Sequence, residues 1–236
     1  MFGIKDAANL FIKKKSDGKM FLYTPYANVT TNEWTADQVE ARAKGVRAII
    51  WNHNKQSTLN VECEVFEMKW LAMMAGSDWV TGSTEVLRRE VVTTDELGAA
   101  TLSGTPVENS LSVFELESDG ISFNSEVEGA TVSGNELTIT DLVNTKIVVF
   151  YMEAVENAKK LTFKFDKYPE NFEIFGDVMI TPKDGGNPEF VQMHWGNAKP
   201  QSNFTITLDA ANPTNLSITF DLLPDENGDM ATYTHI

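Results

Sequence analysis

The sequence has very few of the residues on which catalytic and metal-binding sites depend. A single cysteine, Cys63, occurs in 236 residues, so no disulfide can form within the chain. The three histidines, His53, His194 and His235, stand apart from one another and from Cys63, which excludes the usual ligand spacings of zinc sites. Glycine-rich phosphate loops, dinucleotide fingerprints and nucleophile elbows are absent too. We therefore expect no catalytic residue, no cofactor and no metal.

Long apolar runs are also lacking. No segment reaches the length of a membrane-spanning helix. The apolar stretches of the first 15 residues are short, and the basic cluster follows them, which is the wrong order for a secretion signal. These features predict a protein that is made and folded in a cytoplasm and that has no membrane partner.

Positive charge is scarce, since 19 Lys and Arg face 34 Asp and Glu, for a net charge of −15. A charge this negative disfavours direct binding to nucleic acid, because phosphates repel carboxylates. Residues 1–20 are the exception, with five lysines against two aspartates, which leaves −18 for the remainder. We interpret them as a basic N-terminal arm, either docked on another copy of the protein or solvated and disordered. An acidic run near the C-terminus is interpreted as a solvated turn and not as a cation site: Asp221, Asp225, Glu226 and Asp229.

Alternation of apolar and polar residues, which is typical of strands with one buried face, recurs along the chain. Residues 147–152, IVVFYM, are apolar at every position and predict a central strand that is covered on both sides. Turn residues such as Asp119-Gly120 and Asn212-Pro213 separate the strands. The alternating segments are 58–64, 160–165, 203–208 and 216–221.

Two short segments favour helix. Residues 35–44 begin with a capping pattern, Thr35 and Gln38, and are followed by Gly45. Residues 67–75 carry an apolar stripe and are followed by glycine. The expected fold class is therefore mainly β, a β-sandwich or barrel with one or two short flanking helices.

Residues 93–142 are rich in Ser, Thr, Gly, Glu and Asn and contain only short candidate strands. We interpret them as a hairpin-bearing excursion with too few apolar residues for a core of its own. Its order would then come from contacts with a neighbouring copy, and the alternative is a flexible surface loop. The expected organisation is an arm at 1–20 and a single β domain at 21–236 that contains this excursion.

Three segments carry a resemblance to a known family. They are GVRAIIWNHNKQSTLNVECEVFEMKWLAMMAGSD, the run from TKIVVFYMEAVENAKK to NFTITLDA, and the closing LSITFDLLPDENGDMATY. The first joins two strands to an apolar helix closed by glycine. The second has a strand ending in Tyr-Pro and a later Asp-Gly turn. This order resembles the major tail proteins, or tail tube proteins, of long-tailed bacteriophages over residues 46–236.

The resemblance implies a structural virion protein in which two packed β-sheets are flanked by a helix. Six copies would form a ring, and stacked rings would form a hollow tube that conducts double-stranded DNA from capsid to host. Its partners would be further copies of itself and other tail proteins: tape measure, tail terminator, baseplate or tip proteins, and a sheath in a contractile tail. The protein would be assembled in the host cytoplasm and would reside in the virion tail.

Two groups of charged residues become candidates under this interpretation. Lys13, Lys14 and Lys15 are candidates for contacts between rings, because the basic arm would meet an acidic neighbour. Glu62 and Glu64 are candidates for the lumen wall, because they lie on the polar face of an alternating strand. An acidic wall repels phosphate and lets DNA pass without binding.

A different class of function stays open from the sequence. A β-sandwich binding module, such as a carbohydrate- or receptor-binding surface protein, would use tryptophans as stacking platforms. Trp70 and Trp195 are expected in the core, which weakens this alternative. An enzyme is disfavoured because no set of residues converges on one chemistry.

Overall fold

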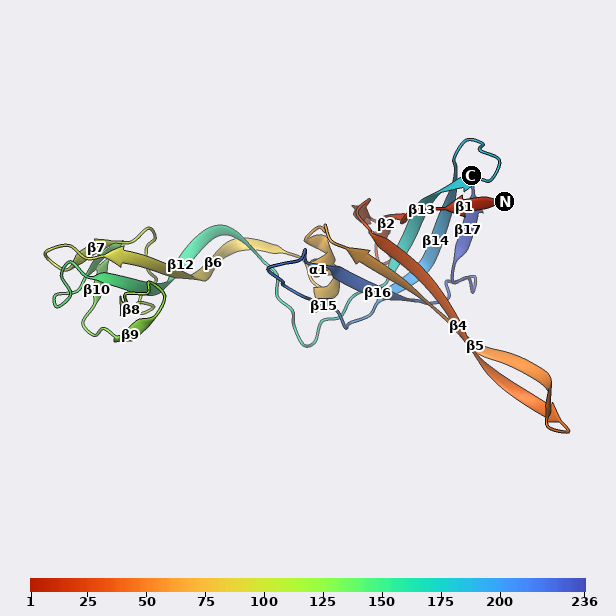
Figure 1. The fold of residues 1–236 in the computed structure, drawn as a ribbon, viewed down its shortest axis with the longest axis horizontal. Helices are drawn as coiled ribbons and strands as arrows, with labels where there is room; N and C mark the ends of the chain where they lie inside the picture. Colours follow the sequence, from red (N-terminus) through yellow and green to blue (C-terminus); the bar gives the residue numbers. More distant parts are fainter. The chain divides into compact units, whose positions relative to one another are not determined.

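A computed structural model describes all 236 residues, and the chain folds into two compact units (Figure 1). We call the first the body, formed by Met1–Asp78 and Leu161–Ile236, and the second the inserted unit, Trp79–Lys160. The architecture is mainly β, as predicted, with one helix of seven residues. No helix of the chain combines the length and the apolar character that a membrane span requires.

The body is built on one large antiparallel sheet with the strand order β3-β2-β13-β14-β16-β5-β4. Strands β1, β15 and β17 pair with β13, β16 and β14 beside this path. The bounds are β1 Phe2–Ile4, β2 Asn9–Lys14, β3 Met20–Thr24, β4 Val29–Ala43, β5 Val46–Cys63, α1 Lys69–Ala75, β13 Phe172–Pro182, β14 Glu189–Pro200, β15 Thr205–Ile206, β16 Leu216–Leu222 and β17 Thr232–His235.

The core of the body lies on one face of this sheet. Alternate residues of the inner strands are buried there, among them Leu59, Val61 and Cys63 of β5, as the alternation predicted. In β16, Leu216, Ile218 and Phe220 are buried in the same way. The alternation at 58–64 and 216–221 is therefore confirmed, because it matches the period of the pleat.

Helix α1 confirms the helix predicted at 67–75. Its residues Trp70, Met73 and Met74 are buried against the core of the sheet. Gly76 ends it in the left-handed conformation (φ 58°), and its N–H donates to the carbonyl of Met73. The chain returns so close that a Cβ on Gly76 would lie 2.3 Å from the carbonyl oxygen of Tyr168. Glycine is therefore required here both by the backbone angle and by space.

The helix predicted at residues 35–44 is wrong, because this segment is the outer part of strand β4. It pairs with the first half of β5, where apolar and β-branched residues are frequent. Gly45, taken as a helix stop, occupies a two-residue hairpin turn with Lys44 (φ 83° and 51°). Pairing with β5 outweighs the local helical preference, which is a weak determinant of structure.

Two of the predicted strands are absent or shorter than expected. Residues 161–171 form no strand, and Phe163 and Phe165 are exposed. Within 203–208 only β15 forms, and Leu208 is exposed. Apolar and polar residues alternate in both segments, but none of the apolar residues is fully buried, so too little burial stabilises a strand there.

The basic N-terminal segment is part of the body sheet. Strand β2 pairs with β13 on one side and with β3 on the other. Leu10 and Ile12 of β2 are fully buried. Residues 9–14 therefore lie within the fold of the same copy and are not disordered, and the docking of residues 1–20 on another copy stays a prediction.

The inserted unit contains a four-stranded sheet of order β6-β12-β8-β9 and a three-stranded sheet of order β10-β11-β7. Residues 147–152 lie in β12, between β6 and β8, which confirms the predicted central strand. The bounds are β6 Val80–Thr93, β7 Ala99–Thr101, β8 Ser112–Leu116, β9 Phe123–Glu126, β10 Thr131–Ser133, β11 Glu136–Thr138 and β12 Lys146–Lys160.

The inserted unit has its own core, contrary to the expectation for residues 93–142. Tyr151 lies at its centre, donates a hydrogen bond to Glu90 Oε1 at 2.5 Å and accepts one from the N–H of Gly104. Strand β12 completes this core with Ile147, Val149 and Tyr151. The buried cluster is Leu102, Val113, Leu137, Ile139, Ile147, Val149 and Tyr151.

That residues 21–236 form one domain stays a prediction. Two compact units can still unfold together as one cooperative domain.

Candidate assembly surface

The outer half of the β4–β5 hairpin is a two-stranded ribbon without other partners. Residues 57–63 of β5 pair with both β4 and β16, whereas residues 46–56 pair with β4 alone. In Figure 1 the ribbon runs on beyond the other strands of its sheet. Both of its faces and both of its edges are therefore open to solvent within one copy.

One face of this ribbon is apolar. Val39 pairs with Trp51, and Ala41 pairs with Ile49, so their side chains lie on the same face. The exposed fractions are 53% for Val39, 49% for Ile49 and 52% for Trp51. We call the following residues the ribbon face: Val39, Ala41, Ala43, Val46, Ile49 and Trp51. An exposed apolar strip on an unpaired hairpin is typical of a surface that is covered by another chain.

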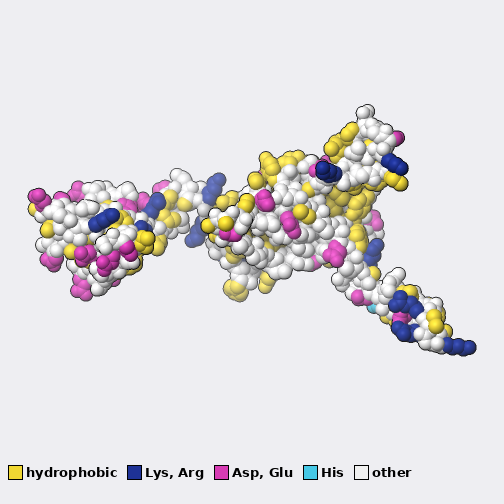
Figure 2. All heavy atoms as spheres, viewed as in Figure 1, with side chains coloured by type: hydrophobic (Ala, Val, Ile, Leu, Met, Phe, Trp, Pro, Cys, Tyr) yellow, Lys and Arg dark blue, Asp and Glu magenta, His cyan; other side chains and the backbone are white.

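The opposite face and the tip of the ribbon are basic. Arg42 and Arg47 pair across the strands and share one carboxylate, Glu40. With Lys44 in the turn, residues 40–47 carry three cationic side chains and one anionic one. Figure 2 shows these Lys and Arg side chains gathered at the end of the ribbon. The ribbon is therefore amphipathic, with an apolar face and a positively charged tip.

The three lysines proposed for contacts between rings have partners within the same copy. Lys13 Nζ lies 2.6 Å from Glu173 Oε2, and Lys14 Nζ lies 3.0 Å from Glu170 Oε1. Lys15 Nζ donates to the carbonyl of Gly196 at 3.1 Å. The role of these lysines between rings stays a prediction, and any neighbouring carboxylate would have to compete with these partners.

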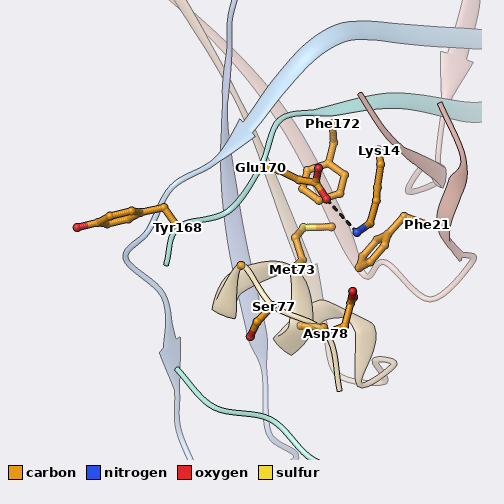
Figure 3. Close-up of a pocket in the computed structure, with 10 residues that line it drawn as sticks. Lys14, Phe21, Met73, Ser77, Asp78, Tyr168, Glu170 and Phe172 are labelled. Carbon is orange, nitrogen blue, oxygen red and sulfur yellow. Dashed lines mark ion pairs between the residues drawn. The ribbon is translucent and has the colours of Figure 1, made fainter. Parts of the chain in front are cut away.

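Lys14 also lines a small pocket of about 280 Å³ beside the end of α1 (Figure 3). Its ammonium group lies 5.3 Å from the centre of the Phe21 ring, while Glu170 accepts from Ser16 Oγ at 2.7 Å. The hydrogen bond to Glu170 raises the pKa of Lys14. Partial burial acts to raise the pKa of Glu170, but hydrogen bonds from Ser16 and Lys14 lower it. Both groups therefore stay charged as a pair, as expected for a structural contact.

The contacts of Glu173 with Lys13 and His194 give a test by pH. Partial burial acts to raise the pKa of Glu173, but hydrogen bonds from Lys13 and His194 lower it overall. A lowered pKa means that the stabilisation is present above the pKa of the unfolded chain and is lost as the pH falls through the folded value. The variant E173Q is therefore expected to lower the free energy of unfolding by about 0.5–1 kcal/mol at pH 7. This difference should vanish well below about pH 4.

Denaturant unfolding of E173Q at pH 7 and at acidic pH would measure this difference. The variant E226Q is a matched control, because Glu226 is exposed and makes no ion pair. A loss in E173Q that is equal at both pH values would contradict the assignment.

Of the two glutamates proposed for the lumen wall, Glu62 lies in β5 on the face opposite Val61 and Cys63. It accepts a hydrogen bond from Asn60 Nδ2 at 3.1 Å, and Asn60 in turn accepts from Ser217. Glu64 follows the end of β5 and is exposed. Glu62 therefore belongs to a polar row that crosses from β5 to β16, while no contact joins Glu64 to that row.

Two further polar residues considered in the sequence, His194 and Asp225, make contacts within the body. No group of three or more His, Cys, Asp or Glu side chains is placed to hold a metal ion. His194 stacks on Phe175 with ring centres 4.4 Å apart and contacts Glu173. Asp225 Oδ1 accepts from the N–H groups of Asn227 and Asp229, so it shapes a turn.

Sequence analysis missed the ribbon face, which is the most distinctive surface of the body. The spacing of Ala36, Val39 and Ala43 fits one side of a helix, and that match concealed the strand. The useful signal was the Lys44-Gly45 pair between two segments of β-compatible residues, which favours a hairpin. The core positions of Trp70 and Trp195 were predicted correctly, since each is 1% exposed.

Two comparisons with known proteins give matches along nearly the whole chain. The model of the YomU/Tube protein family matches residues 2–236. A protein named "Tail tube protein" from Bacillus phage SPR is 23% identical over 234 residues, which covers 96% of this chain and 85% of that protein.

Proposed function

We propose that the chain, which belongs to the YomU/Tube protein family, is the building block of a phage tail tube. The observation that carries the proposal is the ribbon face, an exposed apolar strip on an otherwise unpaired hairpin. A strip of this kind promotes aggregation of a monomer, whereas in a polymer it can form the interface between copies. The similarity to a tail tube protein over nearly the whole chain supports the same role.

The proposed polymer is a hollow tube of stacked hexameric rings within the virion tail. A ring closes when one patch of each copy meets a different patch of the next, and closure leaves no free edge. Other tail proteins would meet the ends of the tube: tape measure, tail terminator, and baseplate or tip proteins. The role is structural, and we propose no catalytic activity.

Negative-stain electron microscopy of the purified protein tests the proposal. Hollow tubes or stacked rings of six copies are expected at high protein concentration or with a nucleating tail complex. A protein that stays monomeric under both conditions would contradict a tail tube role. Tubes with a ring of another symmetry would contradict the hexamer alone.

We further propose that double-stranded DNA passes along an acidic lumen wall to which Glu62 and Glu64 contribute. DNA carries one phosphate charge about every 1.7 Å of helix axis, so lysines on the wall would attract it repeatedly. The variant E62K/E64K is expected to fold and assemble, because Glu64 is exposed and the hydrogen bond that half-buried Glu62 accepts from Asn60 contributes only about 0.5–1.5 kcal/mol. It should slow or block DNA ejection from assembled particles.

Ejection rates of E62K/E64K particles would be compared with those of E96K/E117K particles. The control has the same change in net charge, at exposed residues of the inserted unit. Equal ejection rates in both variants and the wild type would show that Glu62 and Glu64 do not line the channel.

We propose that Lys13, Lys14 and Lys15 contact a neighbouring ring. Point substitutions are needed to test this contact. Deleting residues 1–16 would remove Leu10 and Ile12 from the core, so loss of assembly would then reflect unfolding. Replacing the three lysines with glutamine leaves the strand intact. Reduced salt sensitivity of polymerisation is expected if they meet an acidic neighbour.

A further inference from the structure

The inserted unit carries a groove of about 850 Å³ between the segments 105–113 and 126–134. Its apolar lining includes Leu111, Val113 and Val127, which also pack against the core of the unit. A volume of this size is within the range of ligand-binding sites in proteins, about 300–1,000 Å³. The floor of the groove is therefore fixed by the core, and its mouth is open.

The charged residues that line this groove are all acidic. They are Glu108, Glu126 and Glu128, and no Lys or Arg is among the lining residues. All three glutamates are exposed, and the ion pairs within the chain involve other carboxylates. An apolar floor with unpaired carboxylates around it favours a ligand that combines apolar and cationic side chains.

The tip of the β4–β5 ribbon has this combination of side chains. Val46 is 69% exposed and stands next to Lys44, Arg42 and Arg47. The other basic cluster of the body, Lys13 to Lys15, is already engaged with partners of the same copy. A tight two-residue turn also keeps the tip to the width of two strands, about 5 Å between their axes.

We propose that the groove of the inserted unit in one copy receives the basic tip of the β4–β5 ribbon from a second copy. The inference rests on the proposed self-assembly and names the two surfaces that would meet. Because the surfaces differ, the contact is heterologous, so each copy can give a tip to one neighbour and receive a tip from another. Residues 93–142 would then contribute to contacts between copies, which is the role expected from their composition.

Disulfide cross-linking tests the contact in assembled protein. The variant K44C/E128C places one new thiol in the tip and one in the groove, while the native Cys63 is buried. Mild oxidation of polymerised K44C/E128C is expected to give a ladder of linked copies on a non-reducing gel. The control K44C/E96C carries its second thiol on an exposed residue outside the groove and should give no ladder.

Charge reversal gives a second measurement. The groove variant E108K/E126K/E128K should raise the critical concentration for polymerisation at least tenfold, and R42E/K44E/R47E combined with it should restore assembly. The control E96K/E117K/E136K has the same charge change at exposed positions outside the groove. Circular dichroism would establish that each variant is folded.

The outcomes separate this inference from the proposed function. Normal tubes from folded groove variants, or tubes of K44C/E128C without a ladder, would overturn the contact and leave the tail tube role standing. If the groove variant forms normal tubes but whole particles fail to assemble, the groove would be assigned to a basic segment of another tail protein. That result would also overturn the proposed contact. A wild-type protein that forms no polymer would overturn both.

Discussion

Serine in place of both Ile49 and Trp51 is expected to stop polymerisation while each copy remains folded. These residues lie in the outer half of β5, where β4 is the only partner and about half of each side chain is exposed. Their loss therefore removes little from the core of a single copy. Burying a large apolar side chain completely contributes about 1.5–3 kcal/mol, and about half of each side chain is already covered within one copy, so the two together contribute about 1.5–3 kcal/mol to each contact. The critical concentration should rise by about 10- to 100-fold.

Pelleting assays across a range of concentrations would measure this change. Ile50 provides the matched control, because it is 44% exposed and lies on the opposite, charged face of the same ribbon. The variant I50S is expected to polymerise within a fewfold of the wild-type concentration. If I49S/W51S and I50S polymerise equally well, the ribbon face is not the interface.

The second large effect concerns the stability of the body. Alanine at Gly76 would bring a Cβ to 2.3 Å from the carbonyl oxygen of Tyr168, in a backbone conformation with φ 58°. The atoms nearest to this Cβ position belong to the main chain of Tyr168, which cannot move like a flexible side chain. The end of α1 and residues 161–171 must therefore separate. The variant G76A is expected to lower the free energy of unfolding by more than about 2 kcal/mol. For a chain of this size the melting temperature should fall by roughly 4–8 °C or more.

Gly18 separates the effect of space from that of the backbone angle. It has φ 66°, but no atom lies within 4 Å of the position of its Cβ. The variant G18A therefore meets only the left-handed backbone strain, about 1–2 kcal/mol. Equal melting temperatures for G76A and G18A, measured by calorimetry, would show that the approach of Tyr168 is not rigid.

The parts of the fold that the sequence predicted are those with one buried face. Leu59, Val61 and Cys63 alternate because a packed core lies on one side of β5 and polar side chains on the other. Helix α1 was predicted correctly because its apolar stripe favours a helix and Gly76 favours the end of that helix. The resemblance to tail tube proteins, carried by these same segments, is confirmed by the family match.

The parts that escaped prediction depend on contacts between residues distant in sequence. Residues 35–44 are a strand only because β5 pairs with them, and their own spacing fits a helix equally well. The core of the inserted unit joins Leu102 and Leu137 to Val149 of a strand outside the predicted excursion. For the lysines, the sequence showed their charge but not Glu170 and Glu173, which lie about 160 residues away.

Strand β5 serves two purposes along 18 consecutive residues, Val46–Cys63. Its last residues are fixed by the core through Leu59 and Val61, and its first residues carry the ribbon face. A single inserted residue between Trp51 and Leu59 would turn one of these sets to the wrong side, unless a new bulge absorbed it. Insertion of two residues in β5, matched by two in β4, would keep both sets in place and move the tip by about 7 Å. Across evolution, the reach of this hairpin should therefore change in even steps.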